Sequence, residues 1–294
     1  MEFMPDFDRL KETLPDIQII RFVAMGGYKA VYEAIINGKK EALKIAYIPR
    51  EDDNSNEEPE TLLRIKREIE SLNKCKSPYL VKLGSLKPQW HIIGPKDYLV
   101  YSEEFLEGKS LLELIKEGFK PNFDQCKKLL LCLLYVVKEL KMNNLIHRDI
   151  KPANVLALDN PDRPYVVLDL GIAFKVDSTA ITKDPNAIVG TLPYMPPETF
   201  NENSHQQIDY RGDLYSAALT TYEFASGVHP FVQGSKNDPS TLLRRILTMN
   251  PGPLISYRQD LPEPFCQIID QLIKKIPALR PSNIEALIKK VEAL

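Results

Sequence analysis

The stretch His147-Arg148-Asp149-Ile150-Lys151-Pro152-Ala153-Asn154 decides the fold of this chain. It follows residues 123–142, which we predict to form a buried helix because apolar residues recur there along one stripe. It precedes residues 155–158, which the sequence predicts as a short strand. On its own, such a stretch is a polar turn after a buried helix, so its meaning depends on the segments around it.

The composition is that of a globular protein. The chain has 294 residues, of which 44% are hydrophobic and 27% charged, and this length predicts one large core or two smaller ones. A net charge of −2 argues against nucleic acid and anionic membranes as partners. No apolar run approaches the roughly 20 residues that span a bilayer, and residues 1–15 lack a signal pattern. The four cysteines lack metal-like spacing and are predicted to be reduced thiols, so we expect a cytoplasmic protein.

The first hundred or so residues are predicted to be mainly strands around one helix. The predicted strands are residues 17–23, 31–36, 41–47, 80–86 and 98–103, and the helix is residues 60–74. Asn37-Gly38 predicts a tight hairpin turn. After Gly108 the pattern becomes helical, with predicted helices at residues 123–142, 213–225, 241–249, 265–273 and 283–294.

Asp169-Leu170-Gly171 ends a predicted strand at residues 165–168. A carboxylate at a strand end can chelate a hard cation such as Mg²⁺. Alone, Asp-x-Gly is usually just a turn. Its position downstream of residues 147–154 favours the functional interpretation.

Lys44 and Glu68 are charged residues at positions with mostly apolar neighbours. On its predicted strand, Lys44 shares a face with Ala42 and Ala46. In the predicted helix that follows, Glu68 falls on the apolar stripe. A carboxylate on a buried face needs a cation, so the two residues are candidates for an ion pair, and a surface salt bridge is the simpler alternative.

These segments together resemble the motifs of the eukaryotic-type serine/threonine protein kinases, in the compact style of bacterial members. Residues 147–154 match H-R-D-x-K-x-x-N, and residues 169–171 match D-F-G with Leu for Phe. The resemblance covers residues 17–294 and implies transfer of the γ-phosphoryl group of Mg-ATP to Ser or Thr hydroxyls of proteins. It implies the catalytic residues Asp149, Lys151, Asn154, Lys44, Glu68 and Asp169.

The resemblance gives each of these residues a role. Asp149 would accept or orient the substrate hydroxyl, and Lys151 would offset charge on the γ-phosphate. Asn154 and Asp169 would hold Mg²⁺. Lys44, paired with Glu68, would bind the α- and β-phosphates.

The glycine-rich loop is the weakest match. The pattern G-x-G-x-x-G-x-V falls on residues 24–31, where Ala24 and Lys29 replace two glycines and Gly26 is kept. The resemblance implies ATP-binding residues here: Val23, Ala24, Met25, Gly26, Gly27, Tyr28 and Val31. If the lost glycines weaken phosphate contacts, restoring both should lower the KM for ATP. A KM that rises or stays flat would give Lys29 another role, such as contacting phosphate itself.

Residues 100–108 resemble the hinge between the two kinase lobes. The backbone of Glu104 and Leu106 would bind adenine, and Ala42 and Leu156 would also line the site. Glu103 would then guard the pocket behind adenine, where it is an unusual residue.

Residues 190–198 resemble the block that closes the kinase activation segment. The resemblance implies that Glu198 pairs with Arg280, that Asp213 braces the catalytic-loop backbone, and that Thr191 is structural. Arg148 before the catalytic Asp is often neutralised in this family by a phosphate on the activation segment.

We therefore expect autophosphorylation of the activation segment at one or more of Ser178, Thr179 and Thr182, with Thr182 or Thr179 favoured. The alternative is a solvated loop whose hydroxyls do nothing.

The expected fold is α+β, a bilobal protein kinase fold over residues 16–294. A small β-rich lobe with one helix would cover residues 16–106, a larger helical lobe residues 107–294, and residues 1–15 would be an extension. ATP and Mg²⁺ are the expected cofactors. The expected partners are protein substrates with Ser or Thr acceptors, and neither nucleic acid nor a membrane is expected.

Three alternatives were weighed. A pseudokinase scaffold is favoured slightly by the two lost glycines, but the catalytic residues are all present. A small-molecule kinase of the antibiotic-phosphorylating type usually lacks Arg148 and the block at residues 191–198, both of which this chain has. A nucleic-acid-binding module has no basic stripe to support it.

Overall fold

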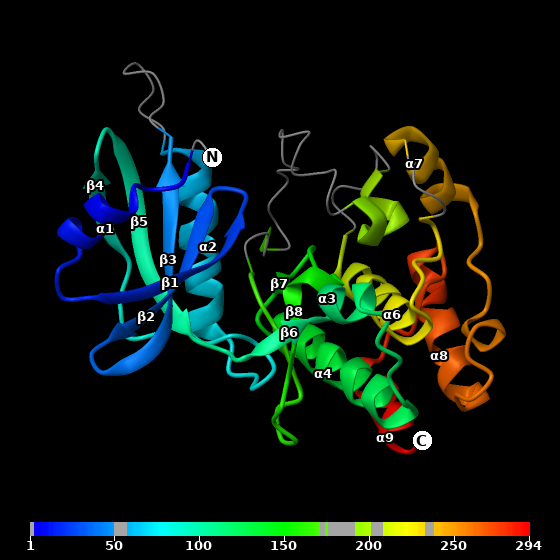
Figure 1. Cartoon of the computed structure of the whole chain (residues 1–294). Coiled ribbons are helices and arrows are strands. Elements are labelled where there is room, and N and C mark those ends of the chain that lie inside the picture. Colours follow the sequence, from blue (N-terminus) through cyan, green and yellow to red (C-terminus); the bar gives the residue numbers. More distant parts are fainter. Residues whose placement is uncertain (1–2, 50–57, 171–173, 176–191, 201–207, 233–237) are drawn as a thin grey trace. The chain divides into compact units, whose positions relative to one another are not determined.

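Figure 1 shows the computed structural model of the chain. The structure describes residues 3–49, 58–170, 174–175, 192–200, 208–232 and 238–294. It divides into two compact units. Unit 1 is Met1–Asn73 with Val81–Glu107, and unit 2 is Lys74–Leu80 with Gly108–Leu294.

Unit 1 is built on a five-stranded antiparallel sheet in the order β1-β2-β3-β5-β4. Its strands are β1 (Gln18–Gly26), β2 (Lys29–Ile36), β3 (Lys39–Ile48), β4 (Gln89–Ile93) and β5 (Lys96–Glu104). Asn37 and Gly38 join β2 to β3 with φ values of 52° and 76°. A two-residue hairpin turn needs positive φ at both positions, so the predicted Asn-Gly turn is confirmed.

Both faces of this sheet are covered by apolar side chains, because successive residues of a strand point to opposite faces. One face packs a cluster that includes Tyr32, Leu43 and Tyr98. The other packs Ala46, Leu99 and Tyr101 against the helix α2 (Glu60–Lys74), whose bounds are those predicted. Leu62, Ile65 and Ile69 supply the apolar stripe of α2.

Unit 1 has a second helix besides α2 where one was expected: α1 (Phe7–Thr13), which lies within residues 1–15, the predicted N-terminal extension. The Asp6 side chain caps α1 by accepting the backbone N–H of Arg9. Leu10 is fully buried in the same cluster as Tyr32, so this segment belongs to the core of unit 1. The sequence hides the helix because it is short and lies between Pro5 and Pro15.

One strand prediction is also corrected, and one strand of unit 1 was missed. Residues 80–86 form no strand but only isolated bridges at Leu80 and Leu83. β4 was not predicted, because its large apolar residues Trp90 and Ile92 are exposed and give no buried alternation.

Unit 2 is mainly helical, as predicted. Its α-helices within the described residues are α3 (Leu111–Lys116), α4 (Phe123–Met142), α6 (Tyr210–Ser226), α7 (Pro239–Thr248), α8 (Glu263–Leu272) and α9 (Ile284–Glu292). Asn122 caps α4 through a capping box with Gln125, and the helix has the predicted bounds. α4 packs against α6 and α9, and this helical core is visible in Figure 1. No helix in the described part of the chain is long and apolar enough to span a bilayer.

Short strands beside α4 and α6 carry the polar segments of unit 2. β6 (Gly108–Ser110), β8 (Val155–Leu158) and β9 (Tyr165–Val167) form a three-stranded sheet. β7 (Leu145–Ile146) pairs with β10 (Phe174–Lys175). Residues 147–154 therefore lie between β7 and β8, next to the helical core.

Candidate active site

The loop between β7 and β8 is held by a carboxylate from the buried helix α6. Asp213 accepts the backbone N–H of His147 at 2.7 Å and that of Arg148 at 2.9 Å, so its predicted bracing role is confirmed. Arg148 has a left-handed backbone, with φ of 64°, a conformation that costs energy for a residue other than glycine. Burial raises the pKa of Asp213, and the two N–H groups oppose that shift. The contacts from α6 therefore fix an otherwise strained turn.

Asp149, Lys151 and Asn154 come together on this loop. The Lys151 ammonium donates to both Asp149 carboxylate oxygens, at 2.8 and 2.9 Å. The Asn154 amide donates to Asp149 Oδ2 at 2.8 Å and to the Asp149 backbone oxygen at 3.0 Å. The Asp149 side chain keeps 15% of its surface exposed. It is therefore an oriented carboxylate that a hydroxyl from outside can reach.

Asn154 and Asp169 lie at the same end of the ribbon formed by β8 and β9. Val155 pairs with Val167 in that ribbon, and the Leu168 N–H donates to the Asn154 carbonyl at 2.7 Å. Asp169 follows directly, with a left-handed φ of 52°. The ribbon therefore brings two oxygen-bearing side chains, 15 residues apart in sequence, to one place.

Five residues of the predicted site region share one face of the unit 1 sheet. The register pairs Val31 with Lys44 and Ala24, and it pairs Ala42 with Glu103. Directly opposite residues point to the same face, so these five residues form a continuous patch. Figure 1 shows α2 running alongside this sheet, and Glu68 comes from that helix.

The ion pair between Lys44 and Glu68 is confirmed, but it is the looser of two. Lys44 Nζ lies 3.7 Å from Glu68 Oε1 and 2.7 Å from Glu103 Oε1. Glu68 instead accepts two hydrogen bonds from Lys29, at 3.0 and 2.8 Å. Sequence reasoning missed both close pairs. The signal for one was Glu103, which follows the apolar run Tyr98-Leu99-Val100-Tyr101 of β5, because a buried carboxylate needs a cation.

The glycine turn between β1 and β2 is closed by the pair Gly26 and Lys29. Gly27 has a φ of 45°, which favours glycine, and a side chain at Gly26 or Gly27 would meet open space. The Tyr28 carbonyl accepts the backbone N–H of Tyr47 at 2.8 Å. The turn is therefore anchored to the sheet through Tyr28, and the space beside Gly26 and Gly27 is unfilled by other residues.

The predicted hinge residues lie at the end of β5 and just beyond it. The Glu104 N–H donates to the Lys82 carbonyl at 2.9 Å. Leu106 lies just beyond the strand and is partly exposed, as is Leu156 on β8 in unit 2.

Several predicted residues lie outside the described part of the chain. They are Gly171, Ser178, Thr179, Thr182 and Thr191. The predicted pair of Glu198 with Arg280 is described and confirmed, with N–O distances of 2.6 and 2.8 Å.

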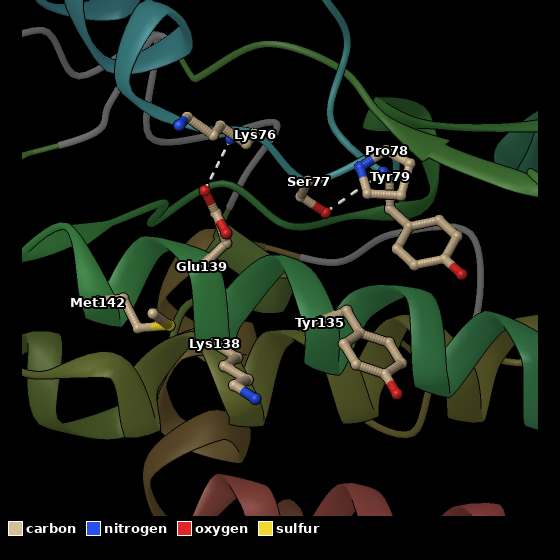
Figure 2. A pocket seen from close by; sticks show the side chains of 8 residues that line it. All are labelled: Lys76, Ser77, Pro78, Tyr79, Tyr135, Lys138, Glu139 and Met142. Carbon is tan, nitrogen blue, oxygen red and sulfur yellow. Dashed lines mark hydrogen bonds between the residues drawn. The ribbon is translucent and has the colours of Figure 1, made fainter.

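A separate pocket in unit 2 contains none of the predicted site residues. Figure 2 shows its lining, where the Glu139 carboxylate on α4 accepts the backbone N–H of Lys76 at 2.7 Å. The lining residues are Lys76, Ser77, Pro78, Tyr79, Tyr135, Lys138, Glu139 and Met142.

Comparison of the sequence with known proteins finds protein kinases among its relatives. The chain is 26% identical, over 94% of its length, to a probable serine/threonine-protein kinase of Clostridium perfringens. It is 29% identical, over 73% of its length, to serine/threonine-protein kinase PrkC of Bacillus subtilis. It is 28% identical, over 94% of its length, to mitogen-activated protein kinase kinase 1 of Arabidopsis thaliana.

The bacterial relatives are longer proteins. The chain spans 38% of the clostridial relative, 31% of PrkC and 73% of the plant kinase. The model of the protein kinase domain matches residues 17–291, nearly the whole chain. This match, together with the α+β architecture of a strand-rich and a helical unit, confirms the predicted fold class. The chain therefore belongs to the protein kinase domain family.

Proposed function

We propose that this protein is a serine/threonine protein kinase, which transfers the γ-phosphoryl group of Mg-ATP to Ser or Thr hydroxyls of proteins. The observation that carries the proposal is the oriented carboxylate of Asp149, held by Lys151 and Asn154 on a loop that Asp213 braces. A pseudokinase would be free to lose this arrangement. The names of the relatives, most of them serine/threonine kinases, support the choice of acceptor.

The proposed chemistry needs a base, a cation and a fixed geometry. Asp149 would accept the proton of the attacking hydroxyl, since an ionised carboxylate within hydrogen-bond reach can serve as the base. Lys151 Nζ is already within 2.9 Å of that carboxylate and would offset the negative charge that gathers on the transferred group. The backbone bonds to Asp213 would keep both residues in place during transfer.

Asn154 and Asp169 suit a magnesium ion. The Asn154 Nδ2 is committed to Asp149, so its amide oxygen is the atom left to bind a cation. Mg²⁺ prefers hard oxygen ligands and is usually held by one or two carboxylates together with water and substrate phosphates. When bound, Mg²⁺ would neutralise phosphate charge.

The unit 1 residues would bind the nucleotide. Lys44, with a side chain only 7% exposed, would contact the phosphates, and the apolar side chains of Val31 and Ala42 on the same face would contact adenine. The Glu104 carbonyl and the Leu106 N–H would hydrogen-bond the adenine edge. The remaining proposed nucleotide contacts are Val23, Ala24, Met25, Gly26, Gly27 and Tyr28 around the glycine turn, and Leu156 in unit 2.

The proposal extends to regulation and location. The protein would phosphorylate itself on one or more of Ser178, Thr179 and Thr182. The cysteines Cys75, Cys126, Cys132 and Cys266 form no disulfides, which suits a cytoplasmic protein.

The test is label transfer by purified protein. Wild type and Asp149→Ala would be incubated with radiolabelled ATP, Mg²⁺ and dephosphorylated casein, and the labelled residues identified by mass spectrometry. We expect phosphoserine or phosphothreonine on casein, and on residues 178–182 of the protein, with wild type alone. ATP binding without transfer by wild type would favour the pseudokinase and refute the proposal.

A further inference from the structure

The charged cluster on the sheet of unit 1 contains two lysines and two carboxylates in alternation. Lys29 donates to both oxygens of Glu68, at 3.0 and 2.8 Å. Lys44 Nζ lies 2.7 Å from Glu103 and 3.7 Å from Glu68. Glu68 on α2 is therefore closer to Lys29, at the end of the glycine turn, than to Lys44 on β3.

Burial makes the charge balance of this cluster strict. The side chains of Glu68 and Glu103 are 1% and 3% exposed. A buried charge is costly unless it is paired, so two buried carboxylates require two cations. Lys29 lies 2.8 Å from Glu68 and Lys44 lies 2.7 Å from Glu103, so each of the two buried carboxylates has a lysine beside it.

Tyr101 lies near the charged side chains of Lys29, Lys44, Glu68 and Glu103. It is fully buried, and among the described residues its hydroxyl has no hydrogen-bond partner. Burial raises the pKa of Tyr101, as does the charge of Glu68, whereas Lys29 and Lys44 act in the opposite direction. The hydroxyl therefore lies within electrostatic reach of both lysines.

Lys29 is the more accessible of the two lysines. Its side chain is 19% exposed and that of Lys44 is 7% exposed. Lys29 pairs in register with Gly26, at the end of a turn that is open where the Cβ of glycine is missing. Its ammonium can therefore be reached by an anion that approaches the turn.

We propose that Lys29 is a second phosphate-binding lysine, which Glu68 positions, and that Glu103 takes over the positioning of Lys44. This inference rests on the proposed function, because the anion it invokes is the triphosphate of ATP. Two cations on one face suit a polyanion better than one, since each charge-assisted hydrogen bond adds to binding. Restoring glycine at position 29 should then raise the KM for ATP, contrary to the expectation that it lowers it.

The first test compares ATP with adenosine, because the lysine acts on phosphates alone. Dissociation constants for Mg-ATP and for adenosine would be measured by calorimetry for wild type, Lys29→Met and Lys39→Met. Lys39 is an exposed lysine on β3, so it controls for the loss of a charge. Lys29→Met should bind ATP about tenfold or more weakly, with adenosine binding unchanged. Unchanged ATP affinity, or an equal loss for adenosine, would overturn the inference.

The second test separates phosphate binding from charge balance. Lys29→Met alone leaves two carboxylates to one lysine, whereas Lys29→Met with Glu103→Gln restores one of each. The reference for ATP binding is Glu103→Gln alone, because Glu103 lies 2.7 Å from Lys44 and its loss can itself weaken binding. The double variant should regain the thermal stability that Lys29→Met loses, yet bind ATP more weakly than Glu103→Gln alone. Equal ATP affinity in these two variants would mean that Lys29 only neutralises Glu68, and the comparison holds even if Lys29→Met alone fails to fold.

Different results would refute the proposed function and the role of Lys29. Wild-type protein that binds ATP no better than adenosine and transfers no phosphoryl group would refute the proposed function. Wild type that binds and transfers, beside a Lys29→Met variant of equal ATP affinity, would refute only the role of Lys29.

Discussion

The guanidinium of Arg280 holds the carboxylate of Glu198 through two hydrogen bonds of 2.6 and 2.8 Å. The Arg280 side chain is fully buried, and it also donates to the backbone carbonyls of Lys274 and Arg211. One side chain thereby joins the segment after α8, the start of α6 and the short helix at Pro197–Phe200. A buried charge at such a junction should matter greatly for stability.

Glu198→Ala should therefore destabilise unit 2. Removing one partner of a buried ion pair leaves the other charge uncompensated, at a cost of about 3–5 kcal/mol. Urea unfolding followed by circular dichroism measures the free energy of unfolding. Glu285→Ala, an exposed glutamate in the first turn of α9, is the control and should cost less than about 1 kcal/mol. If Glu198→Ala and Glu285→Ala lowered the free energy of unfolding equally, the ion pair of Glu198 with Arg280 would not stabilise unit 2.

Leu10→Ala tests whether residues 1–15 are part of unit 1. Leu10 is fully buried in the core, so truncating it should lower the free energy of unfolding by about 2–5 kcal/mol. Glu12→Ala, on the exposed side of the same helix, should change it by less than about 0.5 kcal/mol. A Leu10→Ala variant as stable as the Glu12→Ala variant would show that this segment adds little to the stability of unit 1.

Periodicity was enough to predict the long elements. Residues 60–74 and 123–142 carry apolar stripes over several turns, and both helices have the predicted bounds. α1 and β4 were missed for opposite reasons. α1 buries only Leu10, and a single buried residue gives no helical periodicity. β4 exposes its large apolar residues, so its apolar pattern does not match the side of the strand that is buried.

The candidate site shows the same limit. Motif spacing predicted the residues around Asp149, because they are neighbours in sequence and their contacts are local. It also predicted the charges of Lys44 and Glu68. It could not predict that Lys29 and Glu103 take the closer positions, because which of four buried charges pair depends on side-chain reach across three strands and a helix.

Lys275 should make the stability of unit 2 depend on pH. Burial, and then the charge of Arg280, lowers the pKa of Lys275 to about 8 from its ordinary value of 10.5. Between these two values the unfolded chain binds more protons than the folded one, so the free energy of unfolding should rise with pH. Below pH 8 both states are protonated and this contribution is flat.

The measurement is chemical unfolding at pH 7.5, 8.5 and 9.5, a range that stays below the titration of ordinary tyrosines. Wild type should gain on the order of 1 kcal/mol relative to Lys275→Met over this range. A difference between the two proteins that stays constant with pH would show that Lys275 keeps an ordinary pKa.

The most direct test of the central claim is the rate of phosphoryl transfer from Mg-ATP to a protein hydroxyl in a matched pair of variants. Asp149→Asn keeps the shape of the side chain but removes the base, and Asp159→Asn makes the same change at an exposed site beyond β8. We expect Asp149→Asn to lose at least about a hundredfold in rate, with fold and ATP binding retained, while Asp159→Asn transfers to Ser or Thr like wild type. Transfer by Asp149→Asn at the wild-type rate would contradict it.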